Sequence, residues 1–156
     1  MSLNSMIEGY CSAVFDFDGV IVDSNKGKTN AFRRVLAEDP PELVERFIAY
    51  HLEHGSVSRY VKLEHYYRNM LKRKDYEVAT AKTAQMFGTL SSQILMNAEE
   101  IPGISNLLKI LHDRRVSCFI VTGGKKEEVC NVVKARGWDL YFSRVLGSPA
   151  TKIENL

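Results

Sequence analysis

Hydrophobic residues in this 156-residue chain gather in short continuous runs near its two ends. The first run, residues 11–17 (CSAVFDF), is followed by Gly19 and the apolar triplet at residues 20–22. A second run covers residues 116–121 (VSCFIV), and a weaker third covers residues 141–146. Apolar runs without polar alternation are typical of strands covered on both faces, as in a parallel sheet. We therefore expect three parallel strands.

Helical periodicity separates these runs. From Ile104 onward, leucines recur with the i, i+3, i+4, i+7 spacing of one helix face. A further helix is predicted after Gly124, where three valines share a face and Gly137 is expected to end the helix. Strand, helix and strand in this order imply right-handed crossovers. The predicted fold class is therefore α/β, with a Rossmann-like, doubly wound parallel sheet as its core.

The middle of the chain has no strand-like run and is predicted to be all helical. Pro40, Pro41 and Gly55 interrupt its periodicity. The four expected helices cover residues 26–38, 41–53, 57–72 and 76–97. The predicted organisation is thus an α/β core of residues 8–24 and 101–156, interrupted after its first strand by an all-helical cap at residues 25–100.

Composition narrows the class of protein without naming a function. A hydrophobic fraction of 45% and a charged fraction of 26% are those of an ordinary globular domain. The net charge of +2 is too small to indicate nucleic acid or an anionic membrane as a partner. Three cysteines fit no metal-binding spacing, and Cys11 and Cys118 fall in apolar runs where free thiols are expected to be buried. We therefore expect a cytoplasmic protein.

Asp16 and Asp18 carry the strongest chemical signal. Side chains two residues apart on an extended chain point the same way, so both carboxylates face one side. They follow a buried strand, and open α/β sheets bind ligands at the carboxyl ends of their strands. Two acids placed there can take separate roles, one as nucleophile or metal ligand and the other in proton transfer. An ordinary turn rich in Asp and Gly would give the same string D-x-D-G, but the apolar residues on both sides favour a functional site.

The string DFDGVIVDSN, residues 16–25, resembles the first signature of the haloacid dehalogenase superfamily. The resemblance is to its phosphatase branch with a helical cap, which includes phosphoglycolate phosphatases and β-phosphoglucomutases. It implies that Asp16 attacks phosphorus to form an aspartyl-phosphate, and that Asp18 protonates the leaving group and later activates water. It also implies Mg²⁺ as cofactor, held by the Asp16 carboxylate and the backbone carbonyl of Asp18.

Two later segments resemble the second and third signatures of that family. Thr122 ends the second strand, and its hydroxyl with the N–H of Gly123 is suited to bind a phosphoryl oxygen. Lys152 closes the pattern G-S-P-x-x-K, and a cation there neutralises charge on the transferring phosphoryl group. The family's fourth signature, an acidic Gly-Asp cluster, has no counterpart before the chain stops four residues after Lys152. The sequence is therefore expected to be truncated at its C-terminus.

The expected cap offers candidates for substrate recognition. Arg59, Lys62 and Tyr66 fall at i, i+3 and i+7, on one face of the third expected helix. Such a cationic face is suited to close over an anionic or polyhydroxylated substrate, although a solvent-facing helix would show the same pattern. His51 is a weaker candidate, because a single His near a helix end is often a surface or capping residue.

The sequence thus predicts a Mg²⁺-dependent phosphatase that acts on a small phosphorylated metabolite, without nucleic-acid or membrane partners. Two alternatives stay open at this point. A phosphomutase of the same architecture would return the phosphoryl group to its substrate. A non-catalytic binding protein would keep the fold without a complete metal site. The oligomeric state is left open.

Overall fold

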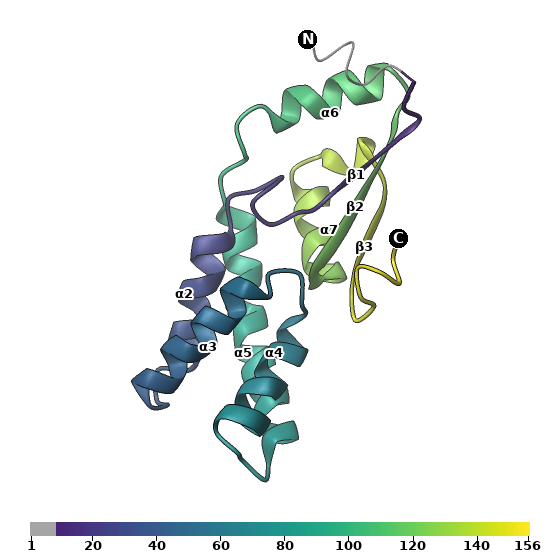
Figure 1. Ribbon diagram of the computed structural model, residues 1–156. Coiled ribbons are helices and arrows are strands. Elements are labelled where there is room, and N and C mark those ends of the chain that lie inside the picture. Colours follow the sequence, from purple (N-terminus) through teal and green to yellow (C-terminus); the bar gives the residue numbers. More distant parts are fainter. Residues whose placement is uncertain (1–8) are drawn as a thin grey trace.

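The computed structural model describes residues 9–156, and its centre is a parallel sheet (Figure 1). The sheet has the order β1-β2-β3, formed by β1 (Ser12–Phe15), β2 (Ser117–Lys125) and β3 (Phe142–Ser148). Each of the three predicted strands is found close to its expected position, which confirms the predicted α/β class. Residue 8, the first residue of the expected core, lies outside the described residues.

Both predicted crossover helices are also present. The connection from β1 to β2 ends in α6 (Ile104–Asp113), and the connection from β2 to β3 contains α7 (Lys126–Ala135) and the 3₁₀ turn η2 (Trp138–Leu140). Gly137 lies between α7 and η2 with φ of +67°, the left-handed conformation typical of a residue that ends a helix.

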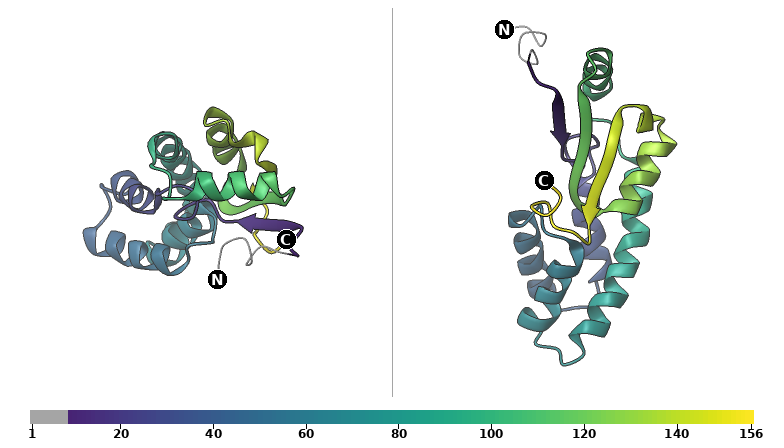
Figure 2. Two further views of the ribbon diagram at one scale, coloured as in Figure 1. Left: turned by 90° about the horizontal axis from the view of Figure 1, so that it is seen from above. Right: turned by 90° about the vertical axis from the view of Figure 1, so that its right-hand side faces the viewer.

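Helices α6 and α7 lie on the same face of the sheet (Figure 2). Ala13 and Phe15 point towards this face and pack against its buried cluster, whereas Val14, between them, is 54% exposed. The expectation that this first run is covered on both faces is therefore wrong for β1. The expectation that Cys11 is buried is wrong too, since Cys11 is exposed, although Cys118 is buried as predicted.

The turn after β1 is pinned into the core. The apolar triplet at residues 20–22 forms no strand of the sheet. Instead Gly19 takes φ of +75° and its N–H donates to the carbonyl of Val22 at 2.8 Å. The N–H of Ile21 donates to the carbonyl of Phe17 at 2.9 Å, and the side chains of Phe17, Ile21 and Val22 are fully buried, whereas Val20 is exposed. This anchored turn fixes the positions of the two acids that precede it.

Residues 25–100, called the helical insert below, form helices near the predicted places. They are α2 (Asn25–Val35), α3 (Pro41–Glu53), α4 (Arg59–His65), its π-helical continuation η1 (Tyr66–Met70) and α5 (Tyr76–Asn97). Ser58 caps α4, because its hydroxyl accepts the N–H of Val61, and this cap places the start of the helix two residues later than expected.

The helical insert has an apolar cluster of its own, distinct from the cluster between sheet and helices. Its largest fully buried members are Phe32, Phe47, Leu63 and Tyr66. The two clusters support the expected division into core and cap, which we keep as a proposal because α5 contributes Leu95 to the cluster under the sheet. The insert lies beyond the carboxyl ends of the strands (Figures 1 and 2). Among residues 9–156, no helix combines the length and apolar character that crossing a bilayer requires.

Candidate active site at the carboxyl ends of the strands

Asp16 and Lys152 meet although 136 residues separate them. The Nζ of Lys152 lies 2.5 Å from Oδ2 of Asp16, and Oδ1 of Asp16 accepts the N–H of Phe17 at 2.8 Å. The two side chains are 38% and 23% exposed. Asp16 therefore presents a carboxylate that is oriented by two donors and still open to solvent, as a nucleophile or a metal ligand needs to be.

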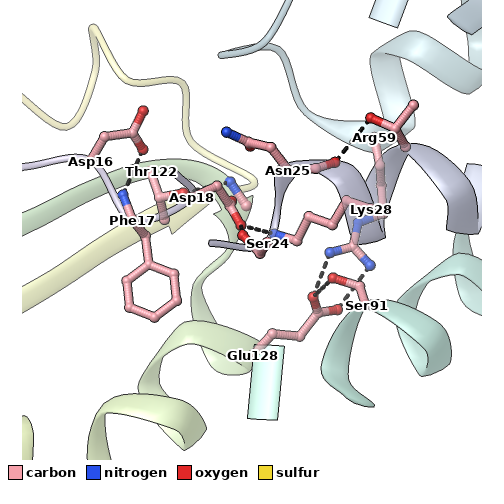
Figure 3. A network of polar contacts seen from close by, with 12 residues as sticks. Asp16, Phe17, Asp18, Ser24, Asn25, Lys28, Arg59, Ser91, Thr122 and Glu128 are labelled. Carbon is pink, nitrogen blue, oxygen red and sulfur yellow. Dashed lines mark hydrogen bonds and ion pairs between the residues drawn. The ribbon is translucent and has the colours of Figure 1, made fainter. Parts of the chain in front are cut away.

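Asp18 is held by two residues of the next segment (Figure 3). Its Oδ1 accepts the hydroxyl of Ser24 at 2.5 Å and lies 2.6 Å from Nζ of Lys28. Ser24 is fully buried, and the Lys28 side chain is 11% exposed. Sequence reasoning missed both partners, because a serine before a helix and a lysine in its first turns are ordinary residues for a solvated helix start.

The carboxyl end of β2 brings Thr122 to the same place. Thr122 is 1% exposed, and its Oγ1 accepts the N–H of Gly124 at 3.0 Å. A Cβ added to Gly124 would lie 3.7 Å from Oδ2 of Asp18 and 3.8 Å from Nζ of Lys28. The hydroxyl, the acid and the lysine therefore surround one small space where β1 and β2 end (Figure 3).

The end of β3 is fixed to the carboxyl end of β2. Ser148 is buried, and its hydroxyl donates to the carbonyl of Gly124 at 3.1 Å. A Cβ on Gly147 would lie only 2.7 Å from that carbonyl, so this close approach requires glycine. The segment that carries Lys152 is thereby anchored at the edge of the site.

The helical insert closes over the carboxyl end of β2. A Cβ on Gly123 would lie 2.3 Å from the carbonyl oxygen of Ser56, so the insert and the end of this strand touch backbone to backbone. Beside this contact is a pocket of about 50 Å³. Its polar lining residues are Asp18 and Lys28 next to the strand ends, and His51, Arg59 and Lys62 from the insert.

Lys62 and His51 form a hydrogen-bonded pair within that pocket. Lys62 is 2% exposed, and its Nζ lies 3.0 Å from Nδ1 of His51 and donates to the His51 carbonyl at 3.3 Å. Burial, together with the positive charge of Lys28, lowers the pKa of Lys62 to about 8. Burial and the charges of Lys62 and Lys28 lower the pKa of His51 to about 4, so this imidazole is neutral at physiological pH.

Arg59 also lines the pocket, but a carboxylate neutralises its charge. Its two terminal nitrogens donate to the two oxygens of Glu128 in α7 at 2.8 and 2.6 Å, and Ser91 in α5 donates to Glu128 at 3.0 Å (Figure 3). Arg59 and Glu128 are 8% and 9% exposed, and Ser91 is fully buried. This network, which sequence reasoning missed, ties the insert to the core.

The alternative of a solvent-facing basic helix is wrong for Arg59 and Lys62, since both are buried. Tyr66, expected on the same face, does not line the pocket and lies instead in the apolar cluster of the insert. Its hydroxyl donates to Asp39 at 3.2 Å, and its pKa is raised because of burial and the charge of that acid.

The donors at the strand ends suit a hard cation. Mg²⁺ prefers oxygen ligands, often one or two carboxylates with water and substrate phosphate. The partly exposed Asp16 carboxylate and the backbone carbonyl of Asp18 are ligands of this kind. Within residues 9–156, no group of three or more His, Cys, Asp or Glu side chains is arranged to hold a metal. The described chain therefore offers two oxygen positions of the right chemistry.

A model of the haloacid dehalogenase-like hydrolase family matches residues 13–154. A search among curated protein sequences gives no match.

Several solved structures share the fold. One is described as a predicted phosphoglycolate phosphatase from Haemophilus somnus (17% identity, TM-score 0.66, 91% of this chain and 65% of that one). A β-phosphoglucomutase from Clostridium difficile gives 19% identity and a TM-score of 0.67 over 87% of this chain and 60% of that one. A third is described as the HAD-hydrolase YfnB from Bacillus subtilis bound to magnesium. It gives 19% identity and a TM-score of 0.60 over 89% of this chain and 65% of that one. At these identities the likeness shows the fold alone, and the chain spans 60–65% of their length.

Proposed function

Because this chain belongs to the haloacid dehalogenase-like hydrolase family, we propose that it hydrolyses a small phosphate monoester with Asp16 as nucleophile. The observation that carries the proposal is the contact of 2.5 Å between Asp16 and Lys152, beside Asp18 and Thr122. It supports the proposal because a carboxylate and a cation meet at the ends of parallel strands, where such sheets bind ligands.

The proposed reaction has two steps. In the first, a carboxylate oxygen of Asp16 forms a bond to phosphorus while the ester P–O bond breaks, and Asp18 gives a proton to the leaving oxygen. In the second, Asp18 takes a proton from a water molecule that attacks phosphorus. The bond to Asp16 breaks, inorganic phosphate leaves, and both acids are restored.

Other residues are proposed to bind and orient the phosphoryl group. The Thr122 hydroxyl and the N–H of Gly123 face its oxygens, and Lys152 neutralises the charge that spreads over them. Ser24 and Lys28 hold the Asp18 carboxylate in place. The Asp16 carboxylate and the Asp18 carbonyl would hold Mg²⁺, which supplies further neutralisation of phosphoryl charge when bound.

The test is release of inorganic phosphate from a panel of small phosphate monoesters, with Mg²⁺ and with EDTA. We expect release with Mg²⁺ that is lost in EDTA and in Asp16→Asn. The intermediate can be sought directly by acid quench and mass spectrometry of the peptide that contains Asp16. Phosphate release that survives Asp16→Asn would refute the nucleophile.

The phosphomutase alternative uses the same four residues, which are Asp16, Asp18, Thr122 and Lys152. The shared fold with β-phosphoglucomutase suits both activities. The two differ in the fate of the phosphoryl group. An isomeric phosphate ester formed without free phosphate would support the mutase. If neither product forms and Mg²⁺ binds no better than to Asp16→Asn, the binding-protein alternative gains. A cytoplasmic location, expected from the cysteines, stays a prediction.

A further inference from the structure

Lys62 is a buried cation with no carboxylate partner among the described residues. Arg59 is paired with Glu128, Lys28 with Asp18, and Lys152 with Asp16. Nζ of Lys62, at 2% exposure, meets only His51, through a ring nitrogen and a carbonyl oxygen. A buried charge costs free energy unless it is paired, so an unpaired one at a pocket wall indicates that its counter-ion is a ligand.

His51 cannot be that counter-ion, because an imidazole carries no negative charge. Its hydrogen bonds also fix its role. Lys62 can only donate, so Nδ1 of His51 accepts, and the remaining proton of the neutral ring sits on Nε2. Nε2 then donates to the hydroxyl of Thr29 at 3.3 Å, which donates in turn to the carbonyl of Asn25 at 2.9 Å. His51 therefore orients Lys62 and leaves its charge uncompensated.

Two of the three N–H groups of Lys62 are used by His51, and a third is available. The groups that face the pocket are Lys62, Lys28 and Arg59, which are positive, Asp18, which is negative, and the neutral His51. The charge of Arg59 is compensated by Glu128. This sums to one excess positive charge in a space of about 50 Å³. One ordered water occupies roughly 10–15 Å³, so the space is large enough for a small group.

We propose that the substrate carries a second, compact anionic group, which Lys62 binds in this pocket while the phosphoryl group lies at Asp16. The inference rests on the proposed function and adds the substrate class, a short phosphorylated organic acid. A carboxylate carries the required charge and is compact. A second phosphate shares the charge but is larger, and the experiment separates the two.

The test measures dissociation constants by calorimetry, with Mg²⁺ and in the Asp16→Asn background so that no ester is consumed. The three ligands are 2-phosphoglycolate, its neutral counterpart 2-hydroxyethyl phosphate, and ethane-1,2-diol bisphosphate. We expect 2-phosphoglycolate to bind at least about 10-fold more tightly than 2-hydroxyethyl phosphate, as for a charge-assisted bond in a buried site. The bisphosphate is expected to bind more weakly than 2-phosphoglycolate.

The matched variants are Lys62→Met, which removes the charge but keeps the length, and Lys82→Met at an exposed position of α5. Lys62→Met should bring the ratio between the acid and the neutral ester close to one, and Lys82→Met should leave it unchanged. Thermal unfolding checks that both variants fold. If the bisphosphate binds most tightly of the three ligands, the group that Lys62 binds is a second phosphate and not a carboxylate.

Equal binding of the acid and the neutral ester, an unchanged ratio in Lys62→Met, or no binding of any ligand would overturn the inference. Failure of the proposed function would look different. In that case the charge-dependent ratio would persist, while the protein with Asp16 intact released no phosphate from any ester.

Discussion

Two groups of polar residues lie at the site, and they differ in how they are built. The strand-end group consists of Asp16, Asp18, Thr122 and Lys152, and its ion pair of Asp16 with Lys152 is 38% and 23% exposed. The insert group consists of His51, Arg59 and Lys62 of the helical insert together with Glu128 of α7, and its ion pair of Arg59 with Glu128 is below 10% exposed on both sides. A partly exposed ion pair stays available to a ligand, whereas a buried ion pair is committed to its own partner.

The difference predicts which substitutions should change activity and which should change stability. An ion pair near solvent contributes at most about 1 kcal/mol to folding, so Asp16 and Lys152 can be altered with little loss of stability. A buried pair leaves an uncompensated charge when one member is removed, so a change of Arg59 or Glu128 should act through stability and the position of the insert.

The largest expected effect is on turnover in Asp16→Asn. Removal of a covalent nucleophile should lower phosphate release by about 10³-fold or more, with a change in unfolding free energy of at most about 1 kcal/mol. Phosphate release and urea denaturation of the same preparations measure both. A large loss of stability in this variant would break the contrast between the two groups.

The next effect belongs to the buried pair. Glu128→Leu leaves the Arg59 guanidinium without its partner, and we expect a loss of about 3–5 kcal/mol in unfolding free energy. The double variant Arg59→Met/Glu128→Leu should recover most of that loss, because it removes both charges. Urea denaturation of the single and double variants checks this, and equal losses in the two would contradict a buried, mutually compensated pair.

A smaller effect is expected where the insert touches the carboxyl end of β2. Gly123→Ala places a methyl group 2.3 Å from the Ser56 carbonyl, so the insert must shift, at a cost of about 1–3 kcal/mol. Gly55→Ala, next to Ser56 in the insert, is the matched control, since nothing lies within 4 Å of its added Cβ. Thermal unfolding of both variants compares them, and similar melting temperatures would show that the contact is easily relieved.

The smallest effect is the pH dependence that His51 contributes. Its folded pKa of about 4 is below the ordinary value of 6.5, so the unfolded chain binds the proton first as the pH falls. Its contribution to stability is present above pH 6.5 and is lost between pH 6.5 and 4, by about 1–2 kcal/mol for a partly buried side chain. His51→Asn keeps an acceptor near the Nδ1 position but does not titrate, so its stability should fall less steeply over that interval. Denaturation of the protein and of His51→Asn at pH 7 and pH 4.5 measures the difference. An equal loss of stability in the two would show that His51 is not its source.

Short-range pattern was enough to predict much of this protein. Apolar runs located the three strands, and periodicity located α6, α7 and the helices of the insert, because strand and helix repeats depend on neighbouring residues. The residues around Asp16, Thr122 and Lys152 stand out for the same reason, since each lies in a compact string at the end of a strand. The local pattern did not predict that one face of β1 is exposed, because burial depends on which helices pack against each face of the sheet.

The residues proposed to choose a substrate were decided by the tertiary structure. Lys28, Ser91 and Glu128 carry no local signal, and they matter because the insert folds back on the strand ends and brings them to Asp18 and Arg59. Arg59 and Lys62 looked alike in the sequence as two cations on one helix face. Only their burial and their partners distinguish them, since a carboxylate in α7 neutralises the first, and a neutral imidazole leaves the charge of the second for a ligand.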